Sequence, residues 1–314
     1  MQKKVLYIIG LLVLIGIALG GWYNFYYIKT PEYSISLIQE AVKKHDVDGF
    51  KKHVDLDSVV AHTVDDYMAV KQKNSKNKDE FGIELVSALK PQITTMLKEE
   101  IVSIVDTGSW EVDESSKIVD KEIIISDVNL KGVNVKKISY VKTEGDFPHL
   151  GVEIETPTLL DAYIMDFEMK KNDDGSWKIT RITNFDEYTQ KIIDQKKEDL
   201  KKYIADTKPY IDEINKRWAA AAKLDRKERY AKFTELCKER LDKLNEWDVP
   251  YGAKELNDLR KEVASMGVEI YTYRNEYENS DKSSPVSREM MEKNYEMNKT
   301  DKKVREIIKE ATEN

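Results

Sequence analysis

An apolar stretch near the start of the chain is the clearest feature of its pattern. From Val5 to Tyr23 no side chain is charged, and about 20 apolar residues span a bilayer core, whereas a signal-peptide core has roughly 7 to 15. The stretch predicts a single transmembrane helix, an anchor over residues 5–28. Its outer end carries rings typical of a membrane interface: Trp22, Tyr23, Phe25, Tyr26 and Tyr27. The alternative is secretion after cleavage near Gly20, because Ala18 and Gly20 are small residues two positions apart.

Charge on either side of this stretch indicates its orientation. Residues 1–4 carry two lysines and the α-amino group, whereas the chain just beyond the aromatic belt carries only Lys29. Positive residues tend to stay on the cytoplasmic side. We therefore expect residues 1–4 to be a cytoplasmic tail and the bulk of the chain to be extracytoplasmic, at a plasma membrane. If positive residues as far as Lys43 and Lys44 are counted, the two sides carry similar positive charge, so the charge difference is confined to the residues nearest the apolar stretch.

Behind the anchor, apolar residues recur every three or four positions, which predicts several short helices. Thr30 is the expected N-cap of the first helix, with Pro31 at its first position. Asp46 and Asp57 precede two further periodic stretches and are the expected N-caps there. Pro91 predicts a kink or a break in the stretch that follows.

The period changes to two between Thr107 and Phe185, which is typical of strands. Five segments share it: KEIIISDV, VKKISYVK, LGVEIETP, DAYIMDFEMKK and SWKITRIT. NDDG, at residues 172–175, is a turn sequence between the last two. We predict an antiparallel meander of four or five strands. Together with the preceding helices it forms an α+β domain over residues 30–185, in which short helices pack on one face of a curved antiparallel sheet.

The helical period returns after the strands and continues to the end of the sequence. We predict an all-α helical bundle of three to five helices over residues 186–314. Thr207 with Pro209 marks an expected helix start. Asp225 with Glu228 has the spacing of a capping box, so a further helix, or a kink, is expected to begin there.

Two stretches resemble known bacterial proteins. YSISLIQEAVKKHDVDGFKKHVDLDSVV, followed by helices, strands and DGSWKITRI, resembles a family known only as a domain of unknown function. The shared features are a first helix, a break centred on an aspartate and the step HVDLD at residues 53–57. The likeness covers about residues 30–185 and implies an anchored or secreted domain, cone-shaped like the nuclear-transport-factor fold. It implies no catalytic residue.

The second resemblance lies in the helical region, within about residues 209–279. FTELCKERLDKLNEWDVPYGAKELNDLRKEVASMGVEIYTY is similar to a helical hairpin that recurs in bacterial surface lipoproteins, with leucines before a proline turn and a second helix after it. Asn257 stands where those chains often have a histidine. The resemblance implies no function for the hairpin.

Composition and charge narrow the classes of partner. The sequence is 40% hydrophobic and 35% charged, with a net charge of −7. Without the two lysines of the tail, 49 basic residues face 58 acidic ones, a charge of −9. Phosphate backbones repel such a surface, so we expect no nucleic-acid partner. Cys237 is the only cysteine, which excludes an intrachain disulfide, and we interpret it as a small hydrophobe on a helix face.

Motifs for catalysis or metal binding are sparse. His45, His53 and His62 are the best metal candidate, but their spacings put no two on one helical face, so we favour three surface histidines. The sequence DVDG at residues 46–49 lacks the later ligands of a calcium loop, and caps and turns explain it. No nucleophile elbow, P-loop or dinucleotide fingerprint occurs. We assign no catalytic residue, no metal site and no cofactor from the sequence.

One helix of the predicted bundle is unusually rich in tyrosine. Because a narrow buried stripe needs fewer rings, four residues form a candidate partner surface: Tyr271, Tyr273, Arg274 and Tyr277. The leading hypothesis is a membrane-anchored extracytoplasmic binding or scaffolding protein of the bacterial cell envelope, without catalysis. The lipid bilayer would hold its N-terminal helix, and an envelope protein would be its partner.

Two alternatives from other classes stay open. One is a small-ligand-binding or enzymatic pocket in the α+β cone, since curved sheets covered by helices commonly hold one. A deep cleft lined by buried polar groups of the sheet would favour it, and a cone filled by large side chains would exclude it, namely by Tyr163, Met165, Phe167 and Trp177. The other is an accessory protein that contacts lipid or cell wall.

Overall fold

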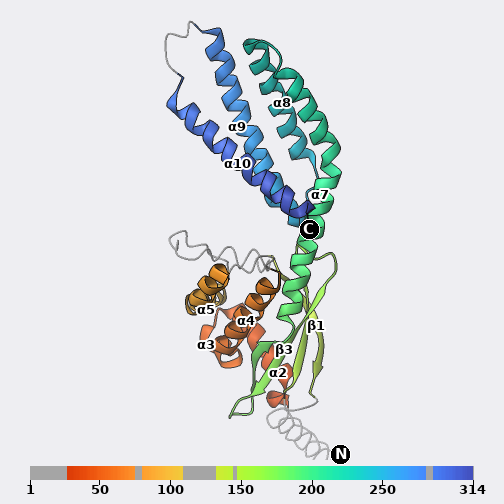
Figure 1. Ribbon diagram of the computed structural model, residues 1–314. Helices are drawn as coiled ribbons and strands as arrows, with labels where there is room; N and C mark the ends of the chain where they lie inside the picture. The colour runs from red at the N-terminus through yellow and green to blue at the C-terminus, as the bar shows by residue number, and fades with distance from the viewer. Residues whose placement is uncertain (1–26, 75–79, 109–131, 144–146, 281–285, 314) are drawn as a thin grey trace, which may run out of the picture. The chain divides into compact units, whose positions relative to one another are not determined.

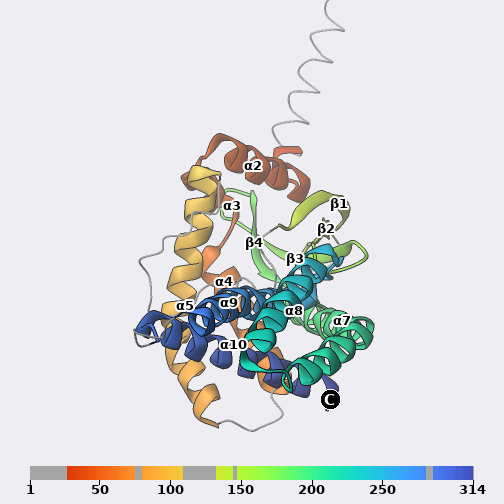
Figure 2. The same ribbon diagram turned by 90° about the horizontal axis from the view of Figure 1, so that it is seen from above.

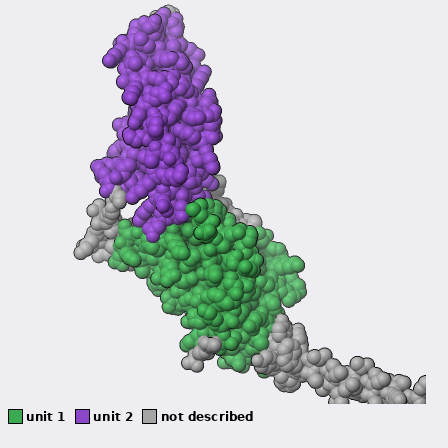
Figure 3. All heavy atoms as spheres, turned by 90° about the vertical axis from the view of Figure 1, so that its right-hand side faces the viewer, with its two compact units in different colours: residues 1–192 green, residues 193–314 purple. Residues whose placement is uncertain are grey.

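The structure is a computed structural model that describes residues 27–74, 80–108, 132–143, 147–280 and 286–313 (Figure 1). The chain divides into two compact units, residues 1–192 and residues 193–314 (Figure 3). The described residues begin at Tyr27, so the predicted anchor and its aromatic belt lie outside them as far as Tyr26. In the part of the chain that is described, no helix combines the length and the apolar character needed to cross a membrane.

Unit 1 begins with helices whose starts follow the capping signals of the sequence. Its helical elements are η1 (Tyr27–Lys29), α2 (Pro31–Lys44), α3 (Val47–His53), α4 (Leu56–Asn74) and α5 (Glu80–Thr107). The predicted cap of α2 is confirmed, because Tyr33 N donates to Thr30 Oγ1 at 3.2 Å. The cap of α3 is confirmed as well, with Gly49 N donating to Asp46 Oδ1 at 2.9 Å. Both side chains satisfy backbone donors that the first helical turn leaves unpaired.

One sequence-based expectation for these helices is wrong, and another is narrowed. The N-cap of α4 is Asp55 and not Asp57, since Ser58 N donates to Asp55 Oδ1 at 3.2 Å. Val54 forms a β-bridge with Ile179. This bridge holds the backbone before Asp55 extended, so α4 begins directly after Asp55. The break that Pro91 offered is absent, since α5 continues to Thr107, whereas the kink stays a prediction. The packing of its buried face outweighs the one backbone hydrogen bond that a proline removes.

The four described strands form one antiparallel sheet in the order β1-β2-β3-β4. They are β1 (Asn134–Lys142), β2 (His149–Glu155), β3 (Tyr163–Lys171) and β4 (Trp177–Ile182). The predicted meander and α+β class are confirmed, while the fifth predicted segment, KEIIISDV, lies outside the described residues. The NDDG turn is also confirmed: Gly175 N donates to Asn172 O at 2.9 Å, and Gly175 takes a φ of +85°, which suits glycine.

The sheet has one apolar face, and helices cover it. Along β3 the side chains of Tyr163, Met165 and Met169 are buried, as the alternation predicts. Figures 1 and 2 show α4 and α5 together on one side of the sheet. Leu150 and Ile154 of β2 belong to the same apolar layer. This layer positions the cavity described below.

The regular elements in the described residues of unit 2 are all helices. Its elements are the larger part of α7 (Phe185–Ala221), then α8 (Arg226–Glu246), η2 (Tyr251–Ala253), α9 (Lys254–Asn279) and α10 (Arg288–Thr312). The predicted start at Asp225 is confirmed, because its Oδ1 accepts from Lys227 N at 2.9 Å and from Glu228 N at 3.1 Å. The predicted start at Thr207 and Pro209 is wrong, since α7 runs through both residues.

Candidate functional site

A cavity of about 470 Å³ lies between the apolar face of the sheet and the helices α4 and α5. Ligand sites in proteins commonly have about 300 to 1,000 Å³. The wall comes from α4, α5, all four strands or their flanks, and the start of α7: Val59, Val60, Thr63, Leu97, Glu100, Ile101, Ile104, Val133, Val135, Val152, Ile154, Met165, Phe167, Ile182 and Phe185.

The sequence periodicities explain why these residues share the wall. On α5, the lining residues Leu97, Ile101 and Ile104 are spaced by four and three, so they occupy one helical face. On β3, Met165 and Phe167 are two apart and point to the same face of the sheet. The helical and strand periods therefore place these side chains on the faces that border the cavity.

Only two of the described residues in the wall have polar side chains, Thr63 and Glu100. The Oγ1 atom of Thr63 is buried and has no hydrogen-bond partner within the described residues. Glu100 is the one charged residue among the described residues of the wall, which include no lysine or arginine. A buried water needs about two to four polar partners, so such a wall favours an apolar occupant over water.

The four large side chains named in the sequence analysis do not fill this space. Met165 and Phe167 stand in the wall. Tyr163 packs beside it, with its ring 5.4 Å from that of Tyr188. Trp177 turns away, because its Nε1 donates to Lys29 O at 2.8 Å. The cleft is also not lined by buried polar groups of the sheet, so its chemistry is that of apolar binding.

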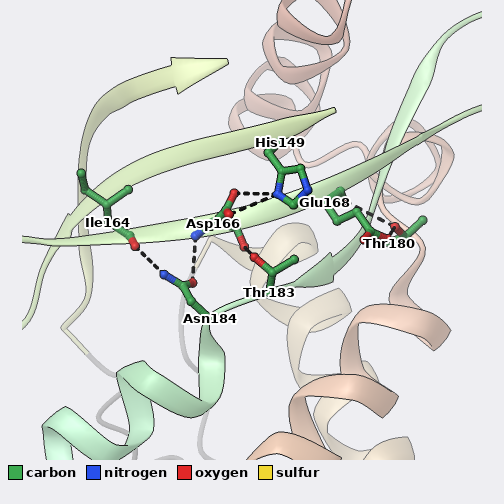
Figure 4. A network of polar contacts seen from close by, with 7 residues as sticks. All are labelled: His149, Ile164, Asp166, Glu168, Thr180, Thr183 and Asn184. Carbon is green, nitrogen blue, oxygen red and sulfur yellow. Dashed lines mark hydrogen bonds and ion pairs between the residues drawn. The ribbon is translucent and has the colours of Figure 1, made fainter. Parts of the chain in front are cut away.

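The opposite face of the sheet carries a polar network (Figure 4). His149 Nδ1 lies 3.1 and 3.2 Å from the two carboxylate oxygens of Asp166, and a carboxylate can only accept, so the proton is on Nδ1. Asn184 bridges two positions of β3: its Oδ1 accepts from Asp166 N and its Nδ2 donates to Ile164 O, both at 2.9 Å. The network ties the start of α7 to the sheet.

Tyr140 completes this network from β1. Its ring lies against Gly151, where an added Cβ would come within 2.3 Å of the ring. Burial raises the pKa of Tyr140, and so does the carboxylate of Asp166. The hydroxyl of Thr180 donates to Glu168 and that of Thr183 to Asp166 O, so neither is activated by His149. In the described residues, the His149–Asp166 pair links β2 to β3, and neither threonine hydroxyl contacts the imidazole.

The three histidines of the metal hypothesis are each bound to a different backbone carbonyl. His45 Nδ1 donates to Val105 O at 2.9 Å, His53 Nδ1 to Trp177 O at 3.1 Å, and His62 Nδ1 to Ser58 O at 2.8 Å. The interpretation as surface histidines is wrong for His53, which is buried. Within the described ranges, no three potential metal ligands gather closely enough to hold an ion.

The tyrosine-rich helix is α9, and its four candidate residues are half-buried. Tyr271 packs its ring 5.1 Å from Phe233 and 5.4 Å from Trp218. Arg274 donates to the hydroxyl of Tyr230 at 3.4 Å. Their use as a partner surface stays a prediction.

The two remaining candidates on α9 pack along the same helix. Tyr273 stacks on Tyr277 with the ring centroids 6.3 Å apart, and its hydroxyl accepts from Ser287 N at 2.7 Å. Asn257, at the position singled out by the lipoprotein resemblance, is buried and accepts from the hydroxyl of Tyr203 at 2.7 Å. This asparagine therefore belongs to the interior of unit 2.

Comparison with known proteins gives no relative: no family model, no curated protein and no solved structure matches this chain. The sequence analysis did not identify the stripe on α5 as part of a site. The stripe was visible as a helical period, but a period indicates which side is buried and not how much space is left beside it.

Proposed function

We propose that this chain is a binding protein of the bacterial cell envelope whose α+β unit takes up a small apolar ligand. Residues 5–28 hold it in the plasma membrane with residues 1–4 inside. The observation that carries the proposal is the cavity of about 470 Å³ with its almost wholly apolar wall. Support for the anchor comes from the uncharged stretch and the rings that follow it.

Energetics favour an occupant in this cavity. An unfilled cavity destabilises a protein by about 24 cal/mol per Å³, so 470 Å³ would correspond to roughly 11 kcal/mol if fully enclosed. Whole domains are stable by only about 5 to 15 kcal/mol. The exposure of Val135, at 61%, shows that the wall reaches the surface, which reduces this cost and provides an entrance. Apolar atoms entering there would replace water that finds few partners.

Photo-crosslinking tests the binding proposal. The full chain in phosphatidylcholine nanodiscs is irradiated with a long-chain alcohol that carries a diazirine, and labelled peptides are mapped by mass spectrometry. We expect labels on the cavity segments of α4 and α5. Val152→Phe adds bulk to the wall and should reduce this labelling at least several-fold. Ile164→Phe adds the same ring to the outer face of the sheet and serves as the matched control.

Two outcomes would count against the binding proposal. One is an absence of label from α4 and α5 in the unmodified chain. The other is an equal loss of label in the Ile164→Phe control, because this would indicate damage to the fold and not a blocked cavity. Labels on residues 5–28 are expected in every variant, since the probe also dissolves in the bilayer.

Protease accessibility tests the anchor and its orientation. Protease added to spheroplasts should digest the chain beyond Lys29 and leave a short membrane-bound fragment. The same treatment of inside-out vesicles should leave the bulk protected. Protection in spheroplasts would contradict the orientation, and release of the chain beyond Gly20 without detergent would indicate cleavage there.

A further inference from the structure

The wall of the cavity crosses the sheet along a diagonal. Each pair of neighbouring strands contributes one register pair to it: Val135–Ile154, Val152–Met165 and Phe167–Ile182. From one pair to the next, the wall moves along the strands by two residues. Three strand spacings of about 4.8 Å and four residues of about 3.3 Å make this diagonal roughly 20 Å long.

The cavity is about as wide as one hydrocarbon chain. A volume of about 470 Å³ over roughly 20 Å leaves a mean cross-section of about 24 Å², so the space is about 5 Å wide. Non-bonded carbon atoms pack about 3.5 to 4.0 Å apart, so one chain fits this width, but a second chain or a fused ring system beside it does not. Because a cavity of about 150 Å³ holds the six carbons of benzene, 470 Å³ holds at most roughly eighteen carbons.

The two ends of the diagonal differ in exposure. At β1, Val135 is 61% exposed. At the other end, Phe185 follows β4 at the start of α7 and is only 2% exposed. Its ring belongs to one buried cluster with Tyr67 of α4 and Tyr188. The cavity therefore has a mouth at β1 and a closed end at the start of α7.

A polar head would find no partner deep in this cavity. The hydroxyl oxygen of Thr63 is itself covered, so a ligand does not reach it. Glu100, the other polar residue of the described wall, is half-buried and would repel an acidic head. A head drawn into the closed end would lose its hydrogen bonds to water without replacement, which is costly.

We infer that the ligand is a single linear hydrocarbon chain of about twelve to eighteen carbons, which enters at β1 with its methyl end first and keeps its polar head outside. This ligand class rests on the proposed binding function. It comprises free single-chain amphiphiles and membrane lipids that insert one acyl chain. Both sources share the chemistry that the cavity recognises.

The experiment locates the two ends of a bound chain. Alcohols of equal chain length within that range carry a diazirine either near the methyl end or near the hydroxyl, and each is crosslinked to the full chain in phosphatidylcholine nanodiscs. Trypsin then releases residues 132–136 from the mouth and residues 182–191 from the closed end. The measured quantity is the label on 182–191 divided by the label on 132–136. Partition of a probe into the bilayer cancels in this ratio, because both peptides meet the same probe.

We expect the ratio to be at least about fivefold higher for the methyl-end probe, because the reverse orientation buries a hydroxyl without a partner. A diol with a hydroxyl at each end should lose the label on 182–191 to a similar extent. A phosphatidylcholine with the diazirine near the methyl end of one chain distinguishes the sources. Label from it on 182–191 would support a membrane lipid, and label from the alcohols alone would support a free amphiphile.

Val152→Phe places a ring midway along the diagonal. It should remove label from 182–191 and leave label on 132–136, which also shows that the mouth is still folded. Ile164→Phe, on the outer face of the sheet, should change neither.

The two proposals fail in different ways. Equal ratios for the methyl-end and hydroxyl-end probes, with both peptides labelled, would overturn the end-on chain and leave apolar binding intact. Undiminished labelling of 182–191 by the diol would overturn it as well. Absence of label from both peptides and from α4 and α5 with every probe would overturn the binding function itself.

Discussion

At the scale of single residues, Cys237 shows how packing decides chemistry. The thiol is buried in α8, as the interpretation of a small hydrophobe requires. It lies so close to α9 that a Cβ added to Gly267 would be 2.6 Å from its Sγ. Burial raises the pKa of the thiol to about 11, with Arg240 acting weakly in the opposite direction. The thiolate, which is the reactive form, is therefore rare near neutral pH.

This predicts a slow thiol. At pH 8 the folded chain should react with a chromogenic disulfide reagent at least about a hundredfold more slowly than the chain in guanidinium, because both the thiolate fraction and access to the sulfur are reduced. The rate is followed by absorbance, with the denatured chain as the control. Rapid reaction of the folded chain at pH 8 would contradict the placement of Cys237 in the interior.

Residue-scale signals in the sequence predicted caps well but chose one wrongly. Thr30, Asp46 and Asp225 each precede a single possible start, and each caps its helix. In the case of Asp55 and Asp57 two aspartates compete, and local sequence does not distinguish them. The backbone N–H of Asp55 donates to Ile179 O at 2.8 Å, so a strand more than a hundred residues away decides which aspartate caps α4. Long-range contacts of this kind are invisible to local rules.

At the scale of elements, both prolines expected to interrupt helices lie inside them. A proline in a helix interior costs about 3 kcal/mol or more through a lost hydrogen bond and a steric clash. Next to Pro209, however, α7 buries Ile204, Thr207 and Ile214. Full burial of one isoleucine contributes about 1.5 to 3 kcal/mol, so the buried face of a long helix outweighs the penalty.

The sheet and the cavity differ in how far the sequence could predict them. Alternation along the chain identified the strands and the buried face of β3, because side-chain direction has a fixed period of two. It could not give the pairing of β1 with β2, in which irregularities follow Val135 and Ile138. Nor could it give the cavity, whose volume depends on the separation between α5 and the sheet and not on either pattern alone.

At the scale of the whole molecule, the two units have separate cores. In unit 1, the cluster around Leu150 combines α2, α4 and the strands. In unit 2, Leu236 is fully buried beside Phe233, whose ring stacks on that of Trp218 at 4.1 Å. Each unit therefore has an apolar core of its own, and domains with separate cores generally unfold as separate cooperative units.

We therefore predict two transitions in scanning calorimetry of the chain, each sensitive to its own core. Leu236→Ala leaves a hole in unit 2 and should lower one transition by the equivalent of about 2 to 5 kcal/mol, while Leu150→Ala should lower the other by a similar amount. An apolar ligand bound in the cavity should raise only the transition that Leu150→Ala lowers, because ligands stabilise the unit that holds them. A single transition that both variants shift equally would show instead that the two cores unfold as one.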